Sequence, residues 1–112
     1  EFLARQQQRF FDAGGKDVII DSGFGFGKTL QHNYRLMNRL EDFHELHAPL
    51  LVGVSRKSMI YKLLETTPQE ALNGTTVLHT IAMMKGAHIL RVHDVQAAVE
   101  ARTLVETMWQ AS

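Results

Sequence analysis

Three short apolar runs, each followed by a longer segment with a helical pattern, constrain the fold of this chain most strongly. The runs cover 18–20, 50–54 and 89–92, and none alternates apolar with polar residues. A strand covered on both faces lacks such alternation, which is typical of parallel sheets. A further helical pattern over 2–13 precedes them. The order predicts an α/β fold, with a preceding helix and three parallel strand and helix units.

The helical segments have recognisable faces and ends. The segment after the first run has one apolar face, formed by Leu30, Tyr34, Met37, Leu40 and Phe43. The region 58–86 is too long for one helix, and Thr67, Pro68 and Glu70 form a capping box that begins a new helix within it. We expect a second break at Gly74. The last helix begins after Asp94 as its N-cap and has an apolar face formed by Val95, Ala98, Ala101, Val105 and Met108.

Three such units are too few to close a barrel. An eight-stranded barrel takes roughly 250 residues, and this chain has 112. The first and last strands would then have exposed edges. The remainder of a barrel is missing, a second copy covers the edges, or the units form an open sheet. The chain begins in a helical pattern without an initiator methionine, so we expect a fragment of something longer.

Composition excludes several classes of function. Lys and Arg total 12, as do Asp and Glu, and no basic stripe is present, which argues against nucleic acid. No apolar stretch approaches the roughly 20 residues of a membrane span. The absence of cysteine removes disulfides and thiolate metal sites, and is compatible with a cytoplasmic protein. We therefore expect small-molecule substrates.

Polar groups follow each of the three predicted strands. They are the segments 21–28, 55–58 and 91–94. In parallel α/β folds the loops at the carboxyl ends of the strands share one face, and ligands bind there. The three segments are therefore expected to meet in one site.

The residue types in these segments suit a heterocycle and an anion. Asp21 can accept hydrogen bonds from ring N–H groups, and Lys57 can donate to a carbonyl or ring nitrogen. Arg91 and His93 lie on the same side of the strand alternation and can hold a phosphate. Ser58 is predicted at a helix N-terminus, where free N–H groups favour an anion such as a carboxylate.

Each of these residues also has a structural interpretation. Asp21 could only cap the turn, and Lys57 could be a solvated lysine. Phe24 and Phe26 could both be core residues under a loop, although a Phe-Gly-Phe turn also leaves one ring facing a cavity. We favour Phe26 for that ring.

Two similar motifs fail on spacing. A phosphate-binding P-loop needs a glycine where this chain has Ser22, so 23–29 is one residue short. His44 and His47 are three residues apart, where a zinc helix of the H-E-x-x-H type needs four. We interpret these histidines as a solvated helix end.

The combined motifs resemble those of a known family. The segments are Asp-Ser-Gly-Phe-Gly-Phe-Gly-Lys at 21–28, Gly-Val-Ser-Arg-Lys-Ser at 53–58, Asn-Gly-Thr at 73–75 and Arg-Val-His-Asp-Val at 91–95. In this order and spacing, the chain resembles the dihydropteroate synthases. The resemblance covers essentially the whole chain and implies the C-terminal part of a (β/α)8 TIM barrel. Pterin-binding barrels of the methyltransferase type share the acid after a strand, but not the Ser-Arg-Lys-Ser and Arg-Val-His segments.

The resemblance implies a reaction of folate biosynthesis and roles for named residues. The family condenses 6-hydroxymethyl-7,8-dihydropterin diphosphate with 4-aminobenzoate, releasing diphosphate, with Mg²⁺ assisting. Sulfonamides compete for the 4-aminobenzoate pocket. The implied residues are Asp21, Lys57 and Arg91 for the pterin, Phe26, Lys57, Ser58 and, more weakly, Ser55 for 4-aminobenzoate, and Arg91 and His93 for the diphosphate.

The chain also departs from the family pattern. Ser22 replaces a usual proline, which we expect to loosen the turn without removing a contacting group. The family's other diphosphate and pterin ligands, and the expected Mg²⁺ ligand, lie in an N-terminal half that this chain lacks. We name no catalytic residue or metal ligand here and expect no turnover from these residues alone. We also expect a homodimer. A non-catalytic remnant that binds an anion or a partner remains the alternative.

Overall fold

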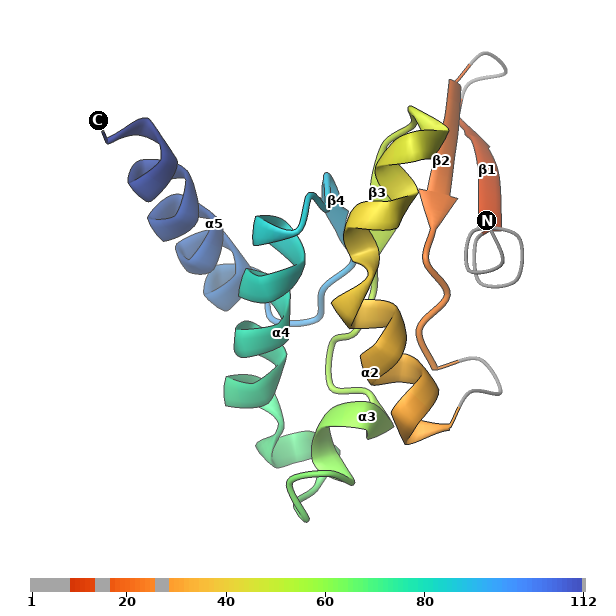
Figure 1. Ribbon diagram of the computed structural model, residues 1–112. Coiled ribbons are helices and arrows are strands. Elements are labelled where there is room, and N and C mark those ends of the chain that lie inside the picture. Colours follow the sequence, from red (N-terminus) through yellow and green to blue (C-terminus); the bar gives the residue numbers. More distant parts are fainter. Residues whose placement is uncertain (1–8, 14–16, 26–28, 112) are drawn as a thin grey trace.

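The computed structural model describes residues 9–13, 17–25 and 29–111. In the part so described, strands and helices alternate along most of the chain (Figure 1). The elements are β1 Arg9–Ala13, β2 Asp17–Asp21, α2 Leu30–Asn38, the 3-10 helix η1 Leu40–Leu46, β3 Leu50–Val52, α3 Ser58–Tyr61, the 3-10 helix η2 Pro68–Glu70, α4 Leu72–Met84, β4 Ile89–Leu90 and α5 Val95–Gln110.

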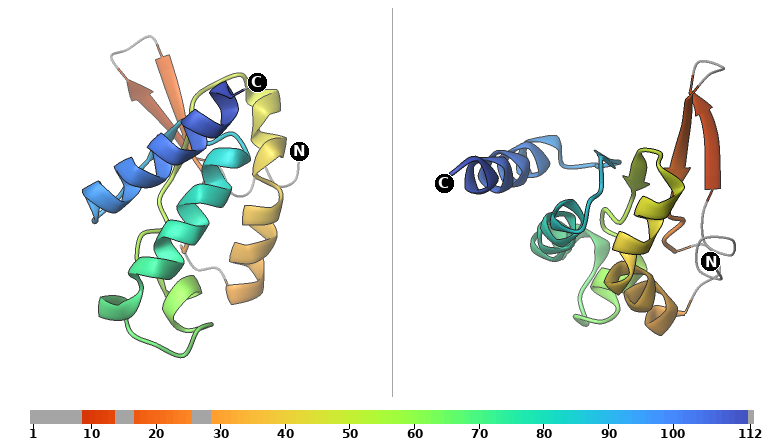
Figure 2. Two further views of the ribbon diagram at one scale, coloured as in Figure 1. Left: turned by 90° about the vertical axis from the view of Figure 1, so that its left-hand side faces the viewer. Right: turned by 45° about the horizontal axis from the view of Figure 1, so that its top comes forward.

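The strands form one sheet in the order β1, β2, β3, β4. β2 pairs with β3 in parallel, with Ile20 opposite Leu50, and β3 pairs with β4 in parallel, with Leu51 opposite Ile89. The three predicted strands are therefore present, parallel and adjacent in chain order. Figure 2 shows the long helices lying together on one side of this sheet.

The segment before the first parallel strand differs from the prediction. A helix was expected over 2–13, but residues 9–13 form β1, which pairs antiparallel with β2. Residues 2–8 lie outside the described residues. β3 covers one edge of β2, and the other edge carries N–H and C=O groups that need partners. Because only 14–16 separate β1 from β2, the loop-closure cost of this pairing is small, and edge pairing prevails over the helical pattern.

The helical region 58–86 is divided as expected at Pro68 but not at Gly74. Pro68 begins η2 with Thr67 at the N-cap position, although the Thr67 side chain makes no capping hydrogen bond. Gly74 lies inside α4, so the predicted break is wrong. A Cβ on Gly74 would lie 2.5 Å from Ile60 Cγ2. The glycine therefore allows α4 to approach α3 closely.

The core lies between the parallel strands and the helices that cover them. Its buried members include Ile20, Leu50 and Val52 from the strands, and Leu36, Leu40, Phe43, Met59 and Ile60 from the helices. In α5 only part of the predicted apolar face is buried, with Ala101 and Val105 covered while Val95 and Met108 are more than half exposed. His44 and His47 are both exposed, in agreement with a solvated helix end.

Candidate active site at the carboxyl ends of the parallel strands

Asp21 places an oriented carboxylate at the end of β2. Its side chain is 4% exposed. Oδ1 accepts a hydrogen bond from the Gly23 N–H at 2.8 Å, and Oδ2 accepts one from Arg91 Nη1 at 3.3 Å. Because a carboxylate offers about four lone-pair sites, Asp21 retains capacity for further N–H donors.

The turn after Asp21 depends on its glycines. Gly23 and Gly25 have φ of 78° and 88°, a region in which a side chain is strained. The Gly25 N–H donates to Oδ1 of the buried Asn33 on α2 at 2.9 Å, which fixes the turn against the following helix.

Ser22 fastens this turn where the resemblance led us to expect loosening. Its N–H and its hydroxyl both donate to the Leu51 carbonyl, each at 3.2 Å. A proline could make neither hydrogen bond, so these two contacts are particular to the serine. Phe24 is buried in the core, as its structural interpretation predicted. Phe26 lies outside the described residues.

Lys57 joins the loop after β3 to the glycine turn. Its Nζ donates to the Phe24 carbonyl at 2.5 Å. A Cβ on Gly25 would lie 3.3 Å from Lys57 Cδ, so the lysine stem passes directly over this glycine. Lys57 therefore stands beside the turn, as predicted from its position after a strand.

Ser58 is the first residue of α3, but α3 has only four residues. The helix macrodipole is a sum over aligned peptide units. The contribution of this helix N-terminus to anion binding is therefore smaller than the sequence pattern suggested.

Arg91 follows β4 and lies against the backbone of β3. A Cβ on Gly53 would be 2.6 Å from Arg91 Nη2 and 2.9 Å from Cζ. The glycine at position 53 thus allows the guanidinium to lie close against the backbone, and a side chain there would displace it from this position. The Arg91 side chain is 49% exposed, so it packs on one side and remains accessible on the other.

Ser55 and His93 connect the loops after β3 and β4. The backbone N–H of His93 donates to Ser55 Oγ at 3.2 Å. Ser55 is buried, whereas His93 is exposed. Ser55 thus supports the His93 backbone and leaves the exposed imidazole free of this contact.

Sequence reasoning missed Arg56, which has the densest hydrogen bonding in this region. Its Nε and Nη2 donate to the two carboxylate oxygens of Asp94 at 2.9 and 3.0 Å. Asp94 occupies the N-cap position of α5, but its side chain caps nothing and pairs with Arg56 instead. The hydrogen bond from Arg56 lowers the pKa of Asp94, and the same contact raises the pKa of Arg56.

A shallow hollow of about 320 Å³ opens between the glycine turn and the loop after β3. Two of its lining residues, Lys57 and Ser58, were predicted as site residues. The full lining is Phe24, Gly25, Arg56, Lys57, Ser58, Tyr61 and Pro68. The hollow lies on the Lys57 side of the site, and the Asp21 and Arg91 pair lies outside its lining.

The structure therefore places six of the predicted site residues in the loops that follow three adjacent parallel strands, namely Asp21, Ser55, Lys57, Ser58, Arg91 and His93. Hydrogen bonds connect these loops through all of the six except Ser58. Among the described residues, no three His, Asp or Glu side chains come together as metal ligands. These residues therefore offer no ready-made cage of protein ligands for Mg²⁺. Within the same ranges, no helix is long and apolar enough to cross a membrane.

The fold and much of the sequence of this chain are shared with known proteins. The family model described as "Pterin binding enzyme" matches residues 1–93. Because this match covers most of the chain, the chain belongs to the pterin binding enzyme family.

Individual relatives show which members of the family this chain is similar to. The chain is 54% identical to the dihydropteroate synthase of Escherichia coli strain K12 over 94 residues, covering 84% of this chain and 33% of that protein. The Yersinia pestis dihydropteroate synthase, in complex with a sulfonamide drug, superposes with a TM-score of 0.81 at 49% identity, over 84% of this chain and 34% of that one.

A third relative is the dihydropteroate synthase of Thermus thermophilus in complex with 6HMPPP. It superposes with a TM-score of 0.79 at 45% identity, covering 85% of this chain and 39% of that one. The chain thus spans about a third of the length of the relatives that it matches.

Proposed function

We propose that this chain supplies one wall of a dihydropteroate synthase active site. The reaction forms a C–N bond between the amine of 4-aminobenzoate and the methylene carbon of 6-hydroxymethyl-7,8-dihydropterin diphosphate. The C–O bond to diphosphate breaks, and the amine loses a proton. The observation that carries the proposal is the buried Asp21 carboxylate held between the Gly23 N–H and Arg91, with Lys57 beside the same turn.

Asp21, Arg91 and Lys57 are the proposed pterin ligands. Asp21 has acceptor capacity for the N–H groups of a pterin, and its burial makes each such hydrogen bond stronger. The Arg91 guanidinium packs on Gly53 and is half exposed on its other side. A planar guanidinium stacks well on a planar ring, so Arg91 is suited to flank the pterin.

Two further sets of residues are assigned to the leaving diphosphate and to 4-aminobenzoate, and Arg91 and Lys57 take a second role in them. Arg91 and His93 stabilise the charge that develops on diphosphate as the C–O bond breaks. Lys57, Ser58 and Ser55 line the 4-aminobenzoate side, together with Phe26, which lies outside the described residues. Holding the amine near the reacting carbon supplies much of the remaining rate enhancement. We propose that Mg²⁺ assists through ligands outside the described residues, and no step here depends on it.

We also propose that the chain is the C-terminal part of a (β/α)8 barrel. The parallel strands are adjacent in chain order, and the long helices lie on one side of the sheet (Figure 2). Right-handed crossovers that always advance in the same direction produce this arrangement, whereas a doubly wound open sheet carries helices on both faces. This supports the barrel over the open sheet.

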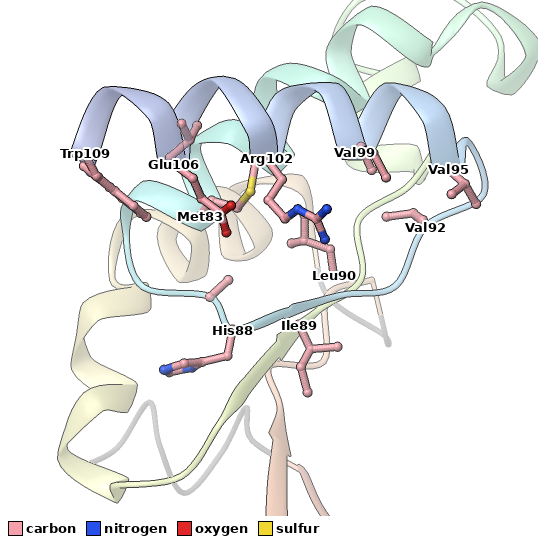
Figure 3. Close-up of a pocket in the computed structure, with 13 residues that line it drawn as sticks. Met83, His88, Ile89, Leu90, Val92, Val95, Val99, Arg102, Glu106 and Trp109 are labelled. Carbon is pink, nitrogen blue, oxygen red and sulfur yellow. The ribbon is translucent and has the colours of Figure 1, made fainter. Parts of the chain in front are cut away.

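The outer side of β4 supports the barrel as well. A groove of about 380 Å³ separates α5 from β4, with Leu90 on one side and Val99 and Trp109 on the other (Figure 3). Within the described residues, β4 pairs only with β3. We propose that the first strand of a complete barrel covers this edge. At the opposite edge of the sheet, a parallel strand would replace β1 as the neighbour of β2, because an eight-stranded parallel barrel contains no antiparallel pair.

We further propose a homodimer and a cytoplasmic location for the complete protein. Large apolar side chains on α4 and α5 are 39 to 72% exposed, namely Leu72, Val77 and Leu104. They supply apolar surface for a homodimer of the complete protein. The absence of cysteine is in keeping with a cytoplasmic location.

Titration of a restored protein tests the proposed function. We define the chimera as this chain preceded by the part of the Escherichia coli relative that lies ahead of the matched region. We expect the chimera to bind 6-hydroxymethyl-7,8-dihydropterin diphosphate in isothermal titration calorimetry. If the chimera is folded by circular dichroism but binds no pterin diphosphate, the proposed function is wrong. The alternative, a non-catalytic remnant, would then be the better interpretation.

A further inference from the structure

Arg56 connects the two loops that carry most of the candidate site. It lies between Ser55 and Lys57 in the loop after β3, and its carboxylate partner Asp94 directly follows His93 in the loop after β4. The two hydrogen bonds to Asp94, at 2.9 and 3.0 Å, form a bidentate pair. Such a pair fixes orientation as well as distance.

The remaining side-chain hydrogen bonds of Arg56 go to backbone carbonyl groups. Nη1 donates to the carbonyl oxygens of Pro68 and Gln69 at 2.6 and 3.0 Å. A guanidinium has five N–H donors, and the four contacts to Asp94, Pro68 and Gln69 engage most of them. Arg56 therefore has little capacity to bind a substrate, although it also lines the hollow beside Lys57.

The backbone of Arg56 is fixed as well. Its φ is 55°, an uncommon value for a residue with a side chain. Its N–H donates to Thr75 Oγ1 at 2.9 Å, and the Thr75 hydroxyl donates to the Ala71 carbonyl at 2.7 Å. The loop after β3 is thus attached to α4 at the residue that reaches across to Asp94.

A second contact connects the same two loops. The His93 N–H donates to Ser55 Oγ one residue away from the ion pair on each side. Lys57 and Ser58 follow Arg56 directly, and Arg91 and His93 precede Asp94. Any change in the separation of Arg56 and Asp94 would therefore change the separation of the groups assigned to 4-aminobenzoate and those assigned to diphosphate.

We propose that Arg56 and Asp94 are positioning residues that hold the 4-aminobenzoate side of the site at a fixed separation from the diphosphate side. This inference rests on the proposed function. The pair contacts neither substrate. It fixes the position from which the amine approaches the reacting carbon.

The test compares Arg56→Lys and Asp94→Asn in the chimera with Glu41→Gln as a matched control. Glu41 pairs with Lys85 at 2.8 Å, which is also an ion pair between distant segments, but it lies away from the strand ends. Misplacing reacting groups by about 1 Å costs on the order of a hundredfold in rate. We expect both site variants to lower kcat by about tenfold or more, with the dissociation constant for pterin diphosphate within about twofold, and Glu41→Gln to change neither.

Hydrogen exchange at the His93 amide supplies a readout that does not need turnover. We expect it to speed up in Arg56→Lys and Asp94→Asn relative to Glu41→Gln, because the contact to Ser55 Oγ loses its neighbouring support. Unchanged exchange, or a kcat equal to that of the control, would overturn the positioning role. A parent chimera without turnover would instead contradict the proposed function, and the exchange data would still decide whether the pair holds the loops together.

Discussion

Asp21 and Arg91 come from positions 70 residues apart in the chain and meet through a single 3.3 Å contact. The carboxylate is buried and the guanidinium is half exposed. Of the two, Asp21 is therefore the better fixed, because its position is set by the strand, by the Gly23 N–H and by burial. At the scale of residues, we therefore propose that Asp21 sets the place at which a heterocycle is held.

Substitution of Asp21 by Asn in the chimera is expected to weaken pterin diphosphate binding. A hydrogen bond to a charged group contributes about 1.5 to 3 kcal/mol, which corresponds to roughly a tenfold to hundredfold rise in the dissociation constant. Isothermal titration measures the change. The control is Asp42→Asn, an exposed acid in η1. Equal affinities for the two variants would show that Asp21 only caps its turn.

His79 is a second residue whose environment leads to a testable prediction. It is buried in α4, and among the described residues its Nε2 is the buried side-chain polar atom without a hydrogen-bond partner. Burial lowers the pKa of His79, and the charge of Asp94 opposes this effect only in part. The folded protein therefore takes up this proton at a lower pH than the unfolded chain does.

The stability of the protein should depend on pH through His79. As the pH falls below about 6.5, the unfolded chain binds the proton first, so the free energy of unfolding decreases. Replacement of His79 by Leu in the chimera should remove this component and raise stability by about 1 kcal/mol at pH 7.5. Urea denaturation at pH 7.5 and 5.5 measures both effects. The control is His32→Leu, at an exposed position. The interpretation would be contradicted if His79→Leu lowered the free energy of unfolding, or if its stability depended on pH in the same way as that of His32→Leu.

At the scale of elements, α3 and α4 meet at Gly74. A Cβ there would be 2.5 Å from Ile60 Cγ2 and 3.2 Å from Leu64 Cδ1. Ile60 is buried and cannot move outward easily. The helix thus tolerates a residue of low helical propensity because the packing of two elements requires it.

Gly74→Ala is expected to destabilise the chimera despite the better helix propensity of alanine. The propensity gain is about 1 kcal/mol, while overpacking costs about 1 to 3 kcal/mol. The net loss should appear as a lower urea midpoint. Asn73→Ala, at an exposed neighbouring position in α4, is the control and should be neutral or slightly stabilising. A Gly74→Ala variant at least as stable as Asn73→Ala would show that the helices can separate without cost.

The same elements show what could be predicted from the sequence. The parallel strands and the strand-end residues Asp21, Lys57 and Arg91 were predicted because apolar runs and polar loops are local patterns. β1 was not, because the strand character of 9–13 is determined by the edge of β2. Gly74 was misassigned because its task is contact with Ile60, which the helical pattern does not reveal.

The Arg56 and Asp94 pair was missed for a related reason. The two residues are 38 positions apart in the chain, and each had a simpler local interpretation. Asp94 fits an N-cap, and Arg56 stands beside the more conspicuous Lys57. A search for opposite charges directly after neighbouring parallel strands could have found them, because such residues come together at the same edge of a sheet.

At the scale of the whole molecule, the described sheet is open at β4, and a groove between β4 and α5 remains uncovered. Within the described residues, the candidate site is formed at the ends of β2, β3 and β4, which contribute an acid, a lysine and an arginine. A pterin ring and a 4-aminobenzoate ring both need enclosure to exclude water and to be held in line. We therefore expect function only when further barrel strands complete the site.

Formation of 7,8-dihydropteroate by the chimera tests this most directly. The chimera and the 112-residue chain alone are each supplied with pterin diphosphate, 4-aminobenzoate and Mg²⁺, and product is measured by chromatography. We predict turnover by the chimera, a loss of most of it in Asp21→Asn, and none by the chain alone. A folded chimera that forms no product, or one whose turnover is indifferent to Asp21, would contradict the assignment of these strand ends as one wall of the active site.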